Sequence, residues 1–366
     1  MKKTALITLE YPPMIGGVSQ YYSHMVEELP EESIVVLDNA KGKLMSRSRF
    51  VYPKWLGSFF SVWNLIRKEK VEQLLVGQLL PLGTVALVFK KLMGIEYTVM
   101  THAMDVQLPF TRGGRKKWLA QRILAEATHV TTVSRYTKQR LVEHGVTAEK
   151  IEIIYPCPHI SGIDSVDDAN TADIRTQFGL RADSTVLLSV CRLVERKGID
   201  TVLQALAILE NTEIEYCIVG GGVDEPRLRE IVKRKGLEQQ VHFLGAISDE
   251  ELEQMYIAAD IFIMPSREIE GGDVEGFGIV FVEANSFGLP VIGGKSGGVV
   301  DAIIDGETGV LVEPESAQMV SDAIKTLFTD KSYATRLGEQ GKKRVEEFFQ
   351  WSNQAQRLKE LLESNQ

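Results

Sequence analysis

The chain alternates short apolar runs with stretches of helical spacing, and it does so in two successive halves. The apolar runs lie at 4–9, 34–37, 74–76, 97–101 and 130–133 in the first half, and at 185–190, 216–219, 241–244, 261–264, 290–292 and 309–312 in the second. This alternation is typical of parallel sheets with crossover helices. We therefore predict two Rossmann-like α/β domains with a cleft between them and ligands at the carboxyl ends of the strands.

The domain boundary is expected near residue 160. A length of 366 residues suits about two domains of ordinary size. The segment 156–170 holds two prolines and an Asp- and Asn-rich run, which is the composition of a linker. We predict an N-terminal domain over 1–160 and a C-terminal domain over 161–349, and we expect a last helix at about 350–366 to pack back on the first domain.

The two halves differ in charge. Residues 1–155 hold 21 Lys and Arg against 14 Asp and Glu, a balance of +7. The totals of 41 and 50 leave 20 and 36 for the rest of the chain, a balance of −16. A basic half joined to an acidic half indicates that one face meets an anionic partner.

Cysteine usage and hydropathy point to the cytoplasm. Cys157, Cys191 and Cys217 show neither metal-binding spacing nor a Cys-x-x-Cys motif, which suits a reducing compartment. The first apolar run is too short for a signal peptide. The most apolar window, 74–89, is interrupted by Pro81 and two glycines, so we expect no membrane span there.

Two glutamates, Glu275 and Glu283, bracket seven residues in the most distinctive segment of the chain. Gly276 and Gly278 open an apolar run of helical spacing, which predicts a loop carrying Glu275 and a helix over about 276–287 carrying Glu283. Eight helical residues separate the carboxylates by about 12 Å, whereas a glycosidase pair lies about 5–9.5 Å apart. The pair could instead hold two ends of one elongated ligand, with the amides of a helix start between them. The alternative is a Gly-rich loop before a core helix, with two solvated glutamates.

Two cations follow the first apolar run of the second half. Arg192 and Lys197 lie five residues apart, across a turn that leads into a helical stretch. An Arg fork and a Lys point charge at the end of a strand suit a diphosphate. The alternative is a surface salt bridge with Glu195.

Two further features lie at predicted strand ends in the first half. Gly16 and Gly17 stand between an apolar run and a helical stretch, the arrangement in which backbone amides meet a phosphate, or in which a tight turn needs glycine. His102 ends another apolar run and could donate to a sugar hydroxyl near a reacting centre. It could equally be a structural histidine.

Taken in order and spacing, these motifs resemble the retaining glycosyltransferases of family 4, which have the GT-B fold. The resemblance spans essentially the whole chain and is most specific from Glu275 to Glu283, with support from the turn Asp305 to Gly309. The segments 265–267 and 272–275 resemble the phosphatidylinositol mannosyltransferase branch. The resemblance implies two Rossmann-like α/β domains whose parallel sheets face each other across a cleft.

The resemblance also implies roles for single residues. The catalytic residues would be His102, Glu275, Arg192 and Lys197. The donor would be bound by Gly16, Gly17, Arg192, Lys197, Glu275, Phe277, Gly278, Ile279, Val280 and Glu283. In this assignment the cations hold the diphosphate, Glu283 the ribose and Glu275 the transferred sugar. No Asp-x-Asp motif stands at a strand end, so we expect neither a metal nor another cofactor.

The implied activity is transfer of a hexose of mannose or glucose type, with retention, from a GDP- or UDP-sugar to a lipid-linked or saccharide acceptor. The sequence departs from the family pattern at Tyr155 to Ile160, and it has Ala103 where a glycine is usual after the histidine. A sugar-nucleotide 2-epimerase of the same fold and a non-catalytic sugar-binding protein remain the alternatives. No nucleic-acid partner is expected.

Two stretches of the basic half combine cations with aromatic residues. They are 47–63, from Arg47 to Trp63, and 112–118, which ends in Lys116, Lys117 and Trp118. This composition is that of a surface resting on an anionic membrane, or of a solvated face with core aromatics behind it. The first reading predicts a peripheral protein on the inner face of the membrane.

Overall fold

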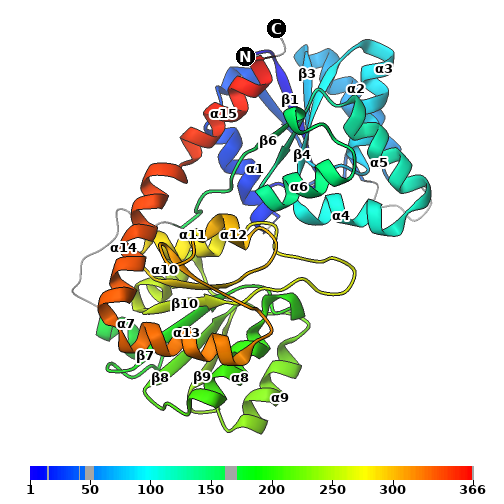
Figure 1. Cartoon of the computed structure of the whole chain (residues 1–366). Helices are drawn as coiled ribbons and strands as arrows, with labels where there is room; N and C mark the ends of the chain where they lie inside the picture. Colours follow the sequence, from blue (N-terminus) through cyan, green and yellow to red (C-terminus); the bar gives the residue numbers. More distant parts are fainter. Residues whose placement is uncertain (15, 41, 46–52, 161–170, 365–366) are drawn as a thin grey trace. The chain divides into compact units, whose positions relative to one another are not determined.

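A computed structural model describes residues 1–14, 16–40, 42–45, 53–160 and 171–364. The chain divides into two compact units (Figure 1). The first unit comprises Met1–Pro156 with Trp351–Gln366, and the second comprises Cys157–Gln350. Residues 161–170 of the predicted linker lie outside the described residues.

The first unit contains a six-stranded parallel sheet with the order β2-β1-β3-β4-β5-β6. Its strands are β1 Thr4–Ile7, β2 Ile34–Leu37, β3 Gln73–Val76, β4 Glu96–Thr101, β5 His129–Thr132 and β6 Ile151–Ile153. The first five correspond to predicted apolar runs. Strand β6 was not predicted, because it has three residues and its central one is a glutamate.

The helices of the first unit are α1 Gly17–Glu27, α2 Gly57–Glu69, α3 Leu82–Met93, α4 Ala103–Arg112, α5 Gly114–Glu126, α6 Arg135–Glu143 and α15 Trp351–Glu363, with the 3-10 turns Glu31–Ser33 and Ala148–Lys150. Helix α4 was not predicted, since Pro109 inside it breaks the expected pattern. Helix α15 packs on α1: Trp351 stacks on His24 and meets Tyr21 edge-on. Gln354 also accepts a hydrogen bond from the amide of Tyr155 at 3.0 Å.

The second unit contains another six-stranded parallel sheet, with the order β12-β11-β10-β7-β8-β9. Its strands are β7 Thr185–Val190, β8 Ile214–Val219, β9 Val241–Gly245, β10 Ile261–Met264, β11 Val291–Gly294 and β12 Gly309–Val312. Its helices are α7 Thr171–Gln177, α8 Ile199–Leu209, α9 Glu225–Lys235, α10 Asp249–Ala258, α11 Ile279–Ser286, α12 Val299–Ala302, α13 Ala317–Thr329 and α14 Lys331–Phe348, with the 3-10 turn Glu195–Lys197.

Both sheets are covered by helices, which explains why their strands read as continuous apolar runs. Strands β3 and β10 are buried at every residue, and β7 at all but its last. A strand that is buried on both faces of a parallel sheet has no polar side to alternate with. The two cores are separate clusters, one in each unit.

Each sheet reverses its strand order at one point. In the first sheet the reversal lies between β1 and β3, and in the second between β7 and β10. The loops that leave the carboxyl ends of two such neighbouring strands diverge and leave a crevice, where ligands of open α/β sheets bind. The fold therefore places one candidate site in each unit, at these strand ends.

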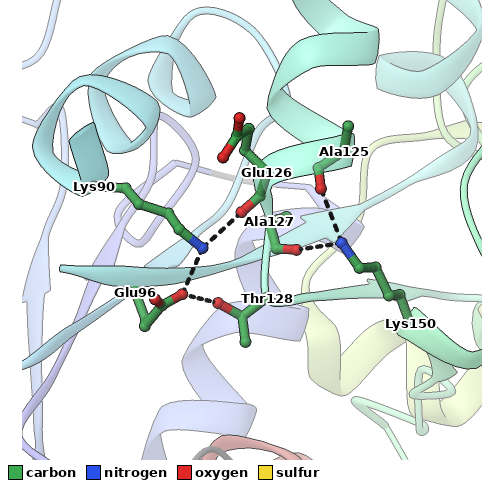
Figure 2. A pocket seen from close by; sticks show the side chains of 7 residues that line it. All are labelled: Lys90, Glu96, Ala125, Glu126, Ala127, Thr128 and Lys150. Atoms are coloured by element: carbon green, nitrogen blue, oxygen red, sulfur yellow. Dashed lines mark hydrogen bonds and ion pairs between the residues drawn. The ribbon is translucent and has the colours of Figure 1, made fainter. Parts of the chain in front are cut away.

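The first unit has a cavity of about 480 Å³ beside the start of β4 and the end of α5. Figure 2 shows the side chains that line it. Lys90 Nζ donates to the carbonyl oxygen of Glu126 at 2.9 Å and pairs with the Glu96 carboxylate at 2.7 Å (Figure 2). Lys150 Nζ donates to two more carbonyl oxygens at the same helix end, at 2.8 and 3.1 Å. Cations favour the negative end of a helix dipole. This cluster therefore stabilises the fold, and it lies at the opposite edge of the sheet from the strand-order crevice.

The described residues include no helix that is both long and apolar enough to cross a membrane.

Gly298, the residue before α12, packs against the loop that follows β10. Its amide donates to the carbonyl oxygen of Glu275 at 2.9 Å. A Cβ atom there would lie 1.9 Å from the backbone oxygen of Gly276, so the loop would have to move. A Cβ on Gly221 would meet only the end of the Glu225 side chain, at 3.8 Å.

We predict that Gly298→Ala lowers the free energy of unfolding of the second unit by about 1–3 kcal/mol, the usual cost of overpacking. Gly221→Ala is the matched control and should cost much less. Calorimetric melting of both variants checks this. An equal, small effect of the two substitutions would contradict the close packing of Gly298 on the loop.

Candidate functional site

The candidate site of the second unit lies at the carboxyl ends of β7 and β10. The loop after β7 carries Arg192 and leads through the turn Glu195–Lys197 into α8. The loop after β10 carries Glu275 and leads into α11. The two loops are joined at the backbone, where the amide of Arg267 donates to the carbonyl oxygen of Arg196 at 2.8 Å.

Glu275 forms a buried ion cluster with two cations from the turn after β7. Its Oε2 lies 2.5 Å from Lys197 Nζ and 2.7 Å from Arg196 Nη1. Burial alone would raise the pKa of Glu275, but the charges of Lys197 and Arg196 outweigh it and hold the pKa at about 2. Glu275 is therefore ionised at any physiological pH, with its carboxylate fixed between two donors.

Arg196 is a site residue that the sequence analysis did not single out. Its guanidinium bridges Glu275 and Asp273, with Nε 3.2 Å from Asp273 Oδ1. The available signal was its position next to Lys197, opposite an acidic segment. The predicted alternative, in which Glu195 pairs with Arg192 or Lys197, does not occur: the ion pair formed by Glu195 joins it to Arg267 at 3.8 Å.

Arg267 stabilises the turn Glu195–Lys197 and the start of α8 that follows it. It is 7% exposed and forms a two-pronged ion pair with Asp200, at 2.9 and 3.1 Å. Burial would raise the pKa of Asp200, but Arg267 and Arg227 together lower it. Because Asp200 lies in the first turn of α8, the pair holds that helix start against the loop after β10.

The predicted amide cradle lies at the start of α11. The helix begins at Ile279, three residues later than the sequence pattern predicted, because Gly278 adopts a left-handed φ of 88°. Gly278 supplies no capping side chain, and the first turn holds no acidic residue. Phe277 is buried and packs edge-on against Phe349, while the amides of Ile279 and Val280 belong to the uncapped first turn. Such a helix start favours a negatively charged group.

Glu283 lies on α11 and is 7% exposed. Its Oε2 accepts from the Tyr256 hydroxyl at 3.1 Å, and its Oε1 accepts from the amide of His159 at 3.3 Å. Burial raises the pKa of Glu283 in spite of these two donors. The solvated alternative for both glutamates is therefore wrong, since Glu283 is buried, the Glu275 side chain is only 13% exposed, and both are hydrogen-bonded.

Arg192 is exposed, and it forms no ion pair with any residue that the structure describes. It thus differs from Lys197, which is buried against Glu275. A cation without a protein partner keeps its charge available for an anion. The structure brings Lys197 and Glu275 into contact and leaves Arg192 on the exposed part of the same loop.

The first unit holds the remaining predicted residues. Gly16 precedes α1 with a φ of 155°, and Gly17 is the first residue of the helix. Both are exposed, the helix has no side-chain cap, and a Cβ on either would meet nothing within 4 Å. The start of α1 is therefore an open helix N-terminus at the end of β1.

His102 lies at the end of β4, before α4, and is held by Tyr22. Its Nε2 is 2.9 Å from the Tyr22 hydroxyl, which also donates to the carbonyl oxygen of Gly77. Because the hydroxyl proton is committed to Gly77, the hydrogen bonds assign a proton to His102 Nε2. Burial lowers the pKa of His102 to about 4, so the imidazole is neutral at physiological pH.

Asp105 lies in the first turn of α4 and accepts a hydrogen bond from the amide of His102 at 2.7 Å. Burial raises the pKa of this carboxyl to about 7, in spite of several backbone hydrogen bonds. The folded protein therefore keeps the Asp105 proton between pH 4 and 7, where the unfolded chain has lost it. This contribution to stability is lost as the pH rises from about 4 to about 7.

We predict that Asp105→Asn raises the melting temperature relative to the wild type more at pH 8.5 than at pH 5, since asparagine keeps the acceptor oxygen without the charge. Melting curves at both pH values measure the difference. Asp183→Asn, at an exposed position, is the control and should show no such pH dependence. A pH-independent effect of Asp105→Asn would contradict the raised pKa.

No group of three or more His, Cys, Asp or Glu side chains is arranged to hold a metal ion within the residues that the structure describes.

Comparison with known proteins identifies the family and the fold. Residues 170–344 match the family model "Glycosyl transferases group 1", and residues 15–158 match "Glycosyltransferase Family 4". The GDP-mannose-dependent alpha-(1-6)-phosphatidylinositol monomannoside mannosyltransferase of Mycolicibacterium smegmatis is 30% identical over 98% of this chain and 97% of its own length. The corresponding enzyme of Corynebacterium glutamicum, named for a monoacylated substrate, is 28% identical over 99% and 98%.

Solved structures of the same fold include Anabaena Alr3699/HepE in complex with UDP-glucose, with a TM-score of 0.82, 20% identity and 99% of both chains covered. They also include sucrose-phosphate synthase from Thermosynechococcus elongatus, with a TM-score of 0.80, 23% identity and 100% and 99% covered. The fold and the family predicted from the sequence are confirmed. The chain belongs to the glycosyl transferases group 1 and is a glycosyltransferase of family 4 with the GT-B fold.

Proposed function

We propose that this glycosyltransferase moves mannose from GDP-mannose, with retention and without a metal, to a lipid-linked acceptor. The observation that carries the proposal is the buried cluster of Glu275 with Lys197 and Arg196, beside the uncapped start of α11. The near full-length relatives named as GDP-mannose-dependent mannosyltransferases support the choice of donor and acceptor class.

The second unit offers the donor three kinds of contact. Lys197 and Arg192 supply positive charge for the diphosphate, and the first amides of α11 supply uncharged donors. The ionised Glu275 supplies an acceptor for sugar hydroxyls. Because Lys197 pairs with Glu275 before the donor arrives, a bound diphosphate would share the lysine with the carboxylate.

Departure of GDP is the chemical step that this arrangement favours. Negative charge grows on the diphosphate as the bond to the sugar breaks, and fixed cations and amides stabilise that charge without reorganising. Since this stabilisation comes from the protein, a divalent cation is not required for it. Neutral His102, fixed by Tyr22, keeps its proton and cannot act as a base through Nε2.

Glu283 would bind the ribose hydroxyls only by changing partners. Both of its oxygens already accept hydrogen bonds, from Tyr256 and from the amide of His159. The raised pKa of Glu283 means that added donors would stabilise its ionised form. We propose that the ribose takes the place of the 3.3 Å contact with His159, which is the longer of the two.

The direct test is an incubation with GDP-mannose and an anionic lipid extract, with and without excess EDTA. We predict mannolipid formation at equal rates in both, with the anomeric configuration of the donor kept in the product, as read by NMR. UDP-glucose serves as the control donor. Loss of activity in EDTA that Mg²⁺ or Mn²⁺ restores would contradict the metal-free mechanism. Conversion of the free donor to another sugar nucleotide would indicate an epimerase.

We predict that Glu275→Gln lowers kcat by about 100-fold or more while affinity for GDP changes little, because the sugar contact matters most in the transition state. Glu195→Gln is the matched control, an exposed glutamate on the neighbouring turn, and should keep full turnover. Steady-state kinetics and calorimetry measure the two quantities. A kcat within a few-fold of the wild type would remove Glu275 from the sugar site.

We further propose that the first unit rests on an anionic membrane surface. Helix α5 begins with three exposed cations, Arg115, Lys116 and Lys117, followed by Trp118 at 66% exposure. Helix α2 adds Phe60, which is 71% exposed. Cations in the first turn of a helix oppose its dipole, so their placement in α5 does not serve helix stability. Residues 46–52 of the other predicted stretch lie outside the described residues.

Each Lys or Arg near an anionic surface contributes about 1 kcal/mol, within a Debye length. We therefore predict binding to phosphatidylglycerol vesicles at low salt and release at high salt. Replacing Arg115, Lys116 and Lys117 by serine should abolish sedimentation with vesicles. Residues 233–235 are three exposed cations at the end of α9, and their replacement by serine is the control. This control variant should still sediment with vesicles. Failure of the wild type to bind at low salt would overturn the membrane proposal.

A further inference from the structure

The first unit has a second cavity, of about 480 Å³, at the carboxyl edge of its sheet. It is lined by the segments that follow β2 and β3 and by helices α3, α4 and α5, and so lies on the edge that open α/β sheets use for ligands. Of the ten lining residues that the structure describes, seven are apolar, among them Trp55, Leu80, Leu108 and Leu119. A cavity of this volume with apolar walls falls in the range of small-molecule sites.

Two polar atoms of this cavity have no hydrogen-bond partner within the described part of the chain. Asp105 Oδ2 and Thr84 Oγ1 are both buried, and neither makes a hydrogen bond with any described residue. Buried polar atoms are normally hydrogen-bonded, so two on one cavity wall indicate a ligand that completes them. The hydroxyl of Thr84 can donate. Because the pKa of Asp105 is about 7, its carboxyl also keeps a proton to donate near neutral pH. Both side chains can therefore donate a hydrogen bond to a ligand oxygen such as an ester carbonyl.

One cation borders the cavity. Lys116 lines it, is exposed, and forms no ion pair within the described part of the chain. Arg115 and Lys117, on either side of Lys116 at the start of α5, are also exposed. The surroundings therefore carry net positive charge, which complements an anionic head group.

We propose that this cavity binds one acyl chain of an anionic glycerolipid, with the chain against the apolar wall, the ester carbonyl at Thr84 and Asp105, and the phosphate at Lys116. The apolar wall, the two polar atoms and the lysine suit a ligand in which an alkyl chain, an ester and a phosphate follow each other. Anionic glycerolipids have this order of groups. The inference rests on the proposed function in one respect, that this lipid is the acceptor. Binding to the cavity does not depend on sugar transfer.

The experiment is a titration of the whole protein with n-alkyl phosphates from butyl to decyl, below their micelle concentrations, followed by calorimetry. Burying one methylene contributes about 0.8 kcal/mol, so each added carbon should tighten binding about fourfold until the cavity is full. Inorganic phosphate should not bind measurably. Affinity that is independent of chain length would overturn the proposal.

Matched variants locate the ligand. Leu108 lies on the cavity wall and is 41% exposed, and Leu108→Asp should weaken the binding of decyl phosphate at least tenfold. Leu92 lies on α3 outside the cavity and is 76% exposed, and Leu92→Asp should leave that binding unchanged. Lys116→Ser should weaken binding of decyl phosphate, and Lys117→Ser, outside the described lining of the cavity, should weaken it much less. Equal effects within either pair would contradict binding in this cavity. Because Leu108 and Leu92 are both exposed, neither change should unfold the protein, and melting curves verify this.

Thr84→Val tests the ester. Valine keeps the shape of the side chain and removes the hydroxyl. The substitution should therefore lower the affinity for decanoyl lysophosphatidate, which has an ester, and leave the affinity for decyl phosphate unchanged. Equal effects on both ligands would remove Thr84 from the ester contact. Mannose transfer is measured separately. Absent transfer with intact chain-length dependence would refute the proposed acceptor but not the cavity, and transfer without chain-length dependence would refute the cavity alone.

Discussion

The ion cluster of Glu275 with Lys197 and Arg196 is the interaction on which the proposed donor site of this protein depends. Placing a carboxylate and two cations in a largely buried position is costly unless each is paired. The fold meets this requirement with residues from two loops that are 78 positions apart, because β7 and β10 are neighbours in the sheet. The Arg267–Asp200 pair and the close packing of Gly298 then hold those loops in place. Loss of any of these supports would leave Glu275 without a fixed position.

The two units offer different chemistry for different parts of a reaction. The second unit is acidic, yet its candidate site combines cations with the uncapped start of a helix, an arrangement that would suit an anionic donor in spite of the net charge. The first unit is basic, and its cavity is apolar with a lysine beside it. Under the proposed function, the second unit would bind the charged donor and the first unit would bind the amphiphilic acceptor.

Much of the fold could be predicted because both faces of each parallel sheet are buried, so the strands appear as apolar runs. The exceptions have local causes: β6 has a polar centre, and α4 contains Pro109. Glu275 and Lys197 could be nominated from the sequence, but their contact could not, since it depends on strand order. Arg196 was missed for the same reason, and Glu283 gave no sign of its bonds to Tyr256 and His159. The cavity at Thr84 and Asp105 is assembled from the segments after β2 and β3 and from helices α3, α4 and α5, and no single motif encodes it.

The most direct test of the donor site is a calorimetric titration of GDP into Arg192→Ala and Lys197→Ala. Arg192 has no ion pair within the described residues, so its loss should leave stability unchanged and remove only a ligand contact. A charge-assisted contact contributes about 1.5–3 kcal/mol. Each variant should therefore bind GDP about 10- to 100-fold more weakly than the wild type. Unchanged GDP affinity in both variants would contradict the account, because neither cation could then hold the diphosphate.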